Sequence, residues 1–195
     1  MLRIVNIEEI QNVSSSISRL VDLQQRHDSN FNEKVKLWLA KLEAILESNR
    51  IMQVSEIATL RGIILSAENG IIPSGVEIHG RLSKRKIIEA AVTFSLRQAS
   101  SSISDFLKKE LDRVSDATLL MRQLMAMAKA KCLILQIPNG NNYDQVLKII
   151  WHTLSSDSEI APGTTSIEGL VGPHDALIIL DRIISSDLKR SQHLN

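Results

Sequence analysis

Leucine, isoleucine, valine and methionine recur at intervals of three and four residues along most of the chain. This spacing gathers apolar side chains on one side of an α-helix and is typical of amphipathic helices that pack around a core. The segments 7–27 and 31–48 each carry such a stripe. Only residues 28–30 separate them, and so short a polar connection predicts an antiparallel helical hairpin.

The same periodicity predicts further helices, over residues 55–69, 84–114, 117–136, 143–155 and 173–188. The serine-rich stretch 100–104 is expected to bend or restart the helix that contains it, because serine competes for backbone hydrogen bonds. Gly70 suits a helix end and Pro173 a helix start. We therefore expect an all-α fold: an irregular multi-helix bundle of about seven or eight helices, opened by the antiparallel helical hairpin.

Two segments interrupt the helical pattern. Residues 70–80 contain Pro73 and three glycines, and residues 156–172 contain Pro162-Gly163 and end on a glycine. Long loops in compact domains are often functional. We therefore expect the 70–80 and 156–172 loops to be adaptable parts of a recognition surface.

The length of 195 residues suits one domain or two small ones. We predict a single helical domain over residues 1–195. The alternative is a subdivision into an N-terminal three-helix part, residues 1–70, and a C-terminal bundle, residues 81–195, joined by the Gly/Pro loop.

Composition narrows the classes of function. The formal net charge is +1 at pH 7, so the chain as a whole has no strong attraction to nucleic acid or to an anionic membrane. The most apolar window, residues 119–138, is interrupted by Arg122, Lys129 and Lys131. Such charges are costly within a bilayer, so the window is interpreted as a core helix. The single cysteine excludes an intrachain disulfide and fits a reducing compartment. These features predict a cytoplasmic protein without a membrane partner.

The strongest local signal is the basic cluster Arg81, Lys84, Arg85 and Lys86 at a predicted helix start. Exposed N–H groups and the helix dipole already favour an anion there, and cations would add to that attraction. The cluster is thus our candidate for binding an anion or a partner. The alternative is an ordinary solvated surface, in which Glu89 pairs with Arg85 one helical turn away.

Other chemistry has weaker support. Cys132 lies in an apolar stretch and is interpreted as a small core residue, and Met121, Met125 and Met127 as core residues of a helix. The histidines show no metal-binding spacing, and His174-Asp175 is interpreted as part of a helix start. We assign no catalytic residue, no metal ligand and no cofactor.

Three classes of function remain. The favoured one is a non-enzymatic protein-interaction or assembly module that binds another protein or itself, with a homodimer through the first two helices as one form. The second is a regulatory protein that binds nucleic acid or phosphate through residues 81–86. The third is a small all-α enzyme whose site is assembled from distant residues.

Overall fold

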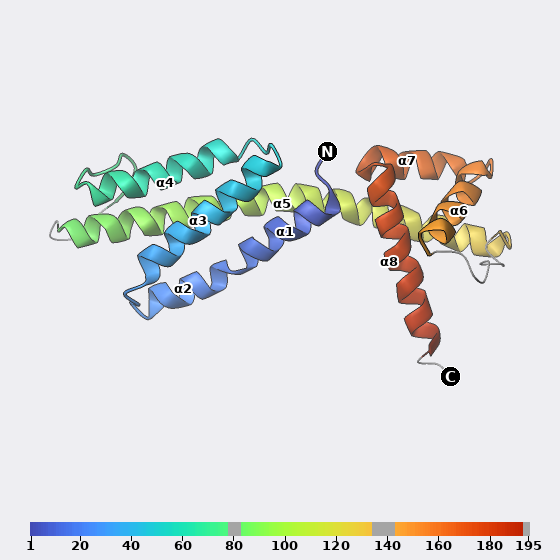
Figure 1. Ribbon diagram of the computed structural model, residues 1–195, viewed down its shortest axis with the longest axis horizontal. Helices are drawn as coiled ribbons and strands as arrows, with labels where there is room; N and C mark the ends of the chain where they lie inside the picture. Colours follow the sequence, from blue (N-terminus) through green and yellow to red (C-terminus); the bar gives the residue numbers. More distant parts are fainter. Residues whose placement is uncertain (78–82, 134–142, 193–195) are drawn as a thin grey trace. The chain divides into compact units, whose positions relative to one another are not determined.

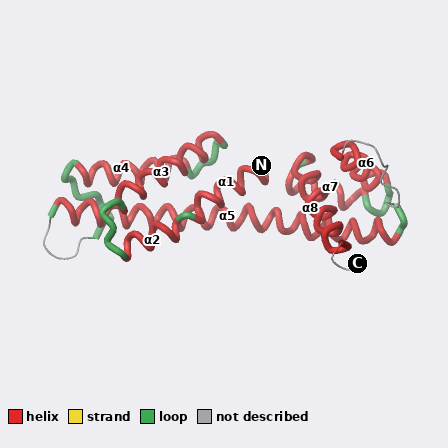
Figure 2. Tube along the Cα trace, turned by 60° about the horizontal axis from the view of Figure 1, so that its bottom comes forward, coloured by secondary structure: helices red, strands yellow, loops and turns green. Residues whose placement is uncertain are grey.

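The computed structural model describes residues 1–77, 83–133 and 143–192. Every regular element in these residues is an α-helix (Figure 2), which confirms the predicted all-α class and the multi-helix bundle. In chain order, the helices are α1 (Ile4–Ser15), α2 (Ile17–Gln25), α3 (Phe31–Ser48), α4 (Val54–Glu68), α5 (Lys84–Ala130), α6 (Tyr143–Ser156), α7 (Ala161–Val171) and α8 (Pro173–Gln192).

The helices form two compact units. The N-terminal unit comprises Val5–Lys109, and the C-terminal unit comprises Met1–Ile4 together with Glu110–Asn195. The chain thus passes between the units inside α5, whereas the alternative subdivision placed the junction in the 70–80 loop. Whether the chain behaves as one domain in solution stays a prediction.

Helices α3 and α4 lie side by side in the N-terminal unit (Figure 1). The stripe that predicted α3 is buried, including Val35, Trp38 and Leu42. Two ion pairs join the solvent edges of the two helices: Lys36 Nζ lies 2.7 Å from Glu68 Oε1, and Arg61 pairs with Glu43. Burial of the shared apolar stripes is the main stabilising contribution, since exposed ion pairs contribute little.

The predicted helix 7–27 is divided into α1 and α2 at Ser16. The Ser16 hydroxyl donates to the Val13 carbonyl at 2.7 Å, and the Trp38 indole donates to the same carbonyl at 2.9 Å. A serine side chain that bonds to its own backbone weakens a helix. Trp38 on α3 then stabilises the break.

Helix α5 continues through the serine-rich stretch 100–104, so the bend expected there was wrong. Its small residues Ala91, Ser95 and Ala99 are fully buried. The Ser95 hydroxyl donates to the Leu60 carbonyl on α4 at 3.1 Å, and Ser102 donates to Glu56 at 2.5 Å. Packing against α4 therefore holds α5 straight where serine alone predicts an interruption.

The C-terminal unit has its own apolar core, whose fully buried large side chains include Met121, Leu154, Ile160 and Ile167. Met125 is buried too, whereas Met127 is 39% exposed. Two of the three methionines assigned to the core thus lie in it.

The prediction of an irregular loop over residues 156–172 was also wrong, because most of this segment forms helix α7. Pro162 lies in the first helical turn, where a missing N–H costs nothing. Ile160, Thr164, Ile167 and Val171 recur at helical spacing and are all buried. The Pro-Gly pair and the polar run after it concealed this stripe.

Helix α5 also runs through residues 115–116, so the predicted boundary between helices 84–114 and 117–136 was wrong, and it ends at Ala130, before the predicted end at residue 136. Cys132 follows with a left-handed backbone (φ 56°) and is exposed. Its assignment to the core was therefore wrong. A residue at this position turns the chain away from the helix, so its side chain leaves the apolar stripe.

Candidate interaction surface

In the described part of the N-terminal unit, one side of α5 stays open to solvent, with α2 along its edge, where Gln24 donates a hydrogen bond to the Thr93 hydroxyl at 2.9 Å. The side chains on this side of α5 are spaced three and four residues apart, as expected for one face of a helix, and each is exposed or half-buried. We call this the outer face of α5, and it comprises Lys86, Ala90, Thr93, Phe94, Arg97, Ser101, Ser104, Asp105 and Lys108.

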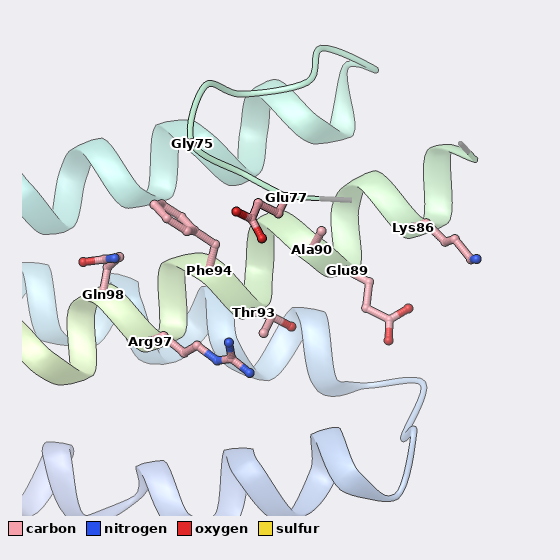
Figure 3. Close-up of a pocket in the computed structure, with 9 residues that line it drawn as sticks. All are labelled: Gly75, Glu77, Lys86, Glu89, Ala90, Thr93, Phe94, Arg97 and Gln98. Carbon is pink, nitrogen blue, oxygen red and sulfur yellow. The ribbon is translucent and has the colours of Figure 1, made fainter. Parts of the chain in front are cut away.

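An open groove of about 560 Å³ lies between this face and the 73–77 part of the preceding loop. Figure 3 shows Phe94 on α5 below Gly75, with Glu77 reaching from the loop toward the helix. The Phe94 ring approaches to 4.0 Å of the place where a side chain on Gly75 would begin. Gly75 also has a left-handed backbone (φ 84°), which glycine adopts without strain.

The charges that line this groove balance. Lys86 and Arg97 contribute two positive charges, and Glu77 and Glu89 contribute two negative ones. Lys86, Glu89 and Arg97 form no ion pair within the described residues. A groove of this kind suits a partner with charges of both signs better than a polyanion.

The predicted basic cluster is divided by the structure. Arg81 lies outside the described residues, and Lys84, Arg85 and Lys86 are exposed in the first turn of α5. Successive helical residues point in different directions. Lys86 accordingly lines the groove beside the 73–77 loop, whereas Arg85 lines a separate hollow with Asp28 and Glu89.

The start of α5 also has a side-chain cap. The Ser83 hydroxyl accepts a hydrogen bond from the Lys86 backbone N–H at 3.3 Å. This contact satisfies one of the free donors that would otherwise attract an anion.

A second open groove, of about 650 Å³, follows the outer face between α2 and α5. On the α2 side it is lined by Ile17, Val21, Gln24 and Gln25. On the α5 side it is lined by Leu96, Arg97, Ser100, Ser101, Ser104 and Asp105. Val21 is 37% exposed. The groove thus combines an apolar rim with small hydroxyl groups and one charge of each sign.

Sequence reasoning singled out only Lys86 and the loop on this surface. Phe94 and Arg97 lie within the predicted helix 84–114 without a signal of their own, and the serine-rich stretch 100–104 was interpreted as a helix interruption. The signal that could have revealed them is the helical spacing of small and polar residues opposite the buried positions Ala91, Ser95 and Ala99.

A different polar cluster lies in the C-terminal unit. The carboxylate of Asp175, in the first turn of α8, accepts a hydrogen bond from the Ile4 N–H at 2.7 Å. Arg113 donates to the carbonyls of Leu2 at 2.8 Å and Leu170 at 2.7 Å. Both side chains therefore anchor the first residues of the chain, and this agrees with the structural interpretation of His174-Asp175.

Within the described residues, no three or more His, Cys, Asp or Glu side chains are grouped to hold a metal ion. In the same part of the chain, no helix combines the length and the apolar character needed to cross a bilayer. Comparisons with protein-family models, with curated proteins and with solved structures found no match.

Proposed function

We propose that this protein is a non-enzymatic helical module for protein interaction or assembly, and that the outer face of α5 is its recognition surface. The 73–77 part of the 70–80 loop contributes one wall of this surface. Helix α7 takes the place of the second loop expected from the sequence, so that segment has no part in the proposal.

The observation that carries the proposal is the pair of grooves along the outer face. Each is an open hollow with room for side chains of a partner. The lining offers an aromatic ring, hydroxyl groups and charges of both signs, which is the mixture expected where a protein surface is recognised.

A photoreactive amino acid at Gln98 tests this function in the cells that naturally make the protein. Gln98 is exposed and lines the groove beside Phe94. Arg19 on α2 is also exposed but lines none of the grooves described here, so the same label at Arg19 is the control. We expect a protein adduct from position 98 and none from position 19. No adduct at position 98, or equal adducts at both, would overturn the proposal.

Binding of nucleic acid or phosphate through Lys84, Arg85 and Lys86 stays the second hypothesis. It has less support because Arg85 and Lys86 line separate hollows, each of which also contains acidic side chains. This hypothesis requires binding that weakens steeply with salt, because neutralised phosphates release counterions. We expect no such binding, and a salt-dependent affinity that Lys84→Glu and Arg85→Glu abolish would favour it instead. The third class, a small all-α enzyme, has no specific observation in its favour.

A further inference from the structure

The outer face of α5 has an unusual composition around Ser101. Surface positions of helices are commonly filled by long, strongly helix-forming residues such as Glu, Lys and Gln. Here Ser100, Ser101 and Ser104 line the groove beside α2, and none of their hydroxyls makes a hydrogen bond within the described residues. Since serine is a mediocre helix former, this run weakens α5 without an internal contact in return. Small side chains do, however, let a second helix approach closely.

Two oppositely charged residues on this face are placed symmetrically about Ser101, whereas Lys86 lies farther along the helix. Arg97 lies four residues before it and Asp105 four residues after it. Both side chains are exposed and form no ion pair within the described residues. The symmetry extends to Phe94 and Lys108, which lie seven residues before and after Ser101.

Such a pattern is complementary to itself. When two identical helices cross antiparallel about a two-fold axis at Ser101, each residue faces the position equally far on the other side of Ser101 in the second copy. Arg97 then faces Asp105 of the second copy, and Asp105 faces its Arg97, so that two ion pairs form. Lys108 faces the half-buried Phe94 ring, which favours a cation–π contact. An interface in which the same patch meets itself is the usual form of a symmetric dimer.

We infer that the outer face of α5 is a self-association surface, on which a second copy of the chain docks through an antiparallel α5–α5 contact centred on Ser101. This inference rests on the proposed function and names the partner. The helix contact from Phe94 to Lys108 is about 21 Å long, at 1.5 Å per residue. One helix pair of that length gives a smaller interface than stable dimers have, so the association is reversible and concentration-dependent.

This surface differs from the one suggested by the sequence. The predicted dimer used the apolar stripes of the first two helices, yet Val35, Trp38 and Leu42 of the second are buried within the N-terminal unit. Those side chains are therefore already occupied, whereas Arg97, Ser101 and Asp105 are exposed.

Charge reversal tests the inference. The mass of the full chain in solution is measured by sedimentation over a wide range of concentration, for the unaltered protein and for Arg97→Asp, Asp105→Arg and the double variant. The unaltered protein should shift from the 21.7 kDa of one chain toward twice that mass. Each single variant places like charges opposite each other twice and should raise the dimer dissociation constant about tenfold or more.

Two combinations of these substitutions, the double variant and a mixture of the two single variants, make the test specific. The double variant restores opposite charges and should associate like the unaltered chain. A mixture of the two single variants should also associate, because one chain then carries two acidic groups at these positions and the other carries two basic groups. Arg19→Asp, which reverses an exposed charge away from this face, is the matched control and should leave the dissociation constant unchanged. Circular dichroism checks that each variant retains its helices.

The outcomes distinguish this inference from the proposed function. A chain that stays monomeric at every concentration, or a dimer that ignores both charge reversals, overturns the self-association surface. The proposed function stands in either case if position 98 still forms an adduct with a different protein. A partner adduct lost in the Arg97→Asp variant, without self-association, would show that the face binds another protein instead.

Discussion

Within the described residues, four helices end with the same pattern of two backbone hydrogen bonds. At the end of α4, the Gly70 N–H donates to the Ala67 carbonyl and the Ile71 N–H to the Ser66 carbonyl, both at 3.0 Å. Equivalent pairs end α2, α3 and α5. The residue at the turn has a left-handed backbone in each, and is His27, Arg50, Gly70 or Cys132. Only Gly70 adopts that conformation without steric cost.

Arg50→Gly should therefore stabilise the protein. Arg50 is exposed and has φ 54°, and relief of its left-handed conformation is expected to raise the free energy of unfolding by roughly 0.5–1 kcal/mol. Gly70→Ala is the reverse change at φ 81° and should lower it by about 1 kcal/mol. Chemical denaturation measures both. A loss of stability in Arg50→Gly would contradict the role assigned to this turn.

Sequence identified one of these four ends, Gly70, because glycine is the residue type that the left-handed turn favours. The other three ends have His27, Arg50 and Cys132 at the turn, and these residue types do not predict a left-handed backbone. Cys132 was consequently assigned to a helix core that ends two residues earlier. The backbone conformation at these positions is imposed by the two hydrogen bonds, and residue type alone does not reveal it.

Asp157 gives a prediction for pH. The hydrogen bond from Lys131 lowers the pKa of its carboxyl, and the backbone N–H groups of Glu159 and Ile160 lower it further. A lowered pKa means that the folded state favours the charged form of Asp157. The charged carboxylate therefore stabilises the folded protein fully above the ordinary aspartate pKa of about 3.9. The contribution is lost as the pH falls through the lowered value.

Asp157→Asn should accordingly flatten the dependence of the melting temperature on pH below about pH 4. Differential scanning calorimetry across this range compares the variant with the unaltered chain. Glu47→Gln is the control, since Glu47 is an exposed carboxylate that is not part of any ion pair shown here. If the melting temperature of Asp157→Asn falls as steeply below about pH 4 as that of the unaltered chain, the assigned contact between Asp157 and Lys131 is contradicted.

At the scale of the element, α7 contains two glycines in contrasting surroundings. A Cβ on Gly163 would lie 2.6 Å from a methyl carbon of Leu124, which is 7% exposed. A Cβ on Gly169 would meet nothing within 4 Å. Substitutions at these two positions therefore test close packing and helix propensity separately within one helix.

Gly163→Ala should lower the free energy of unfolding by about 1–3 kcal/mol, because it overpacks the site beside Leu124. Gly169→Ala should raise it by about 0.5–1 kcal/mol, because alanine is the better helix former and here has room. Denaturant unfolding of the two variants gives the comparison. Equal effects of the same sign would mean that α7 does not pack as described.

The existence of most helices followed from apolar periodicity, but their continuity did not. Serines 14–16 accompany a break after α1, whereas the serine-rich stretch 100–104 lies within an uninterrupted α5. The two stretches have nearly the same composition, so the difference comes from tertiary contacts. Ser95 and Ser102 bond to α4 from one side of α5, whereas the Ser16 hydroxyl bonds to its own preceding turn.

For the whole molecule, the sequence anticipated the class of fold and part of the proposed surface. It predicted Lys86 and the neighbouring loop as candidates, and these lie at one groove. It did not anticipate Phe94, Arg97, Ser101 or Asp105. Their common exposure depends on which side of α5 faces α4, and that is a property of the assembled unit. The charge symmetry about Ser101 becomes meaningful only once that side is known.

Cross-linking at the symmetry axis tests the self-association surface most directly. With Cys132→Ser as background, Ser101→Cys places a thiol where the two copies cross, and mild oxidation then joins the chains. Ser18→Cys, on α2 and absent from the groove lining, is the control. We predict a covalent dimer of twice 21.7 kDa from Ser101→Cys and single chains from Ser18→Cys. Single chains from both variants, or equal dimer from both, would contradict the antiparallel contact at Ser101.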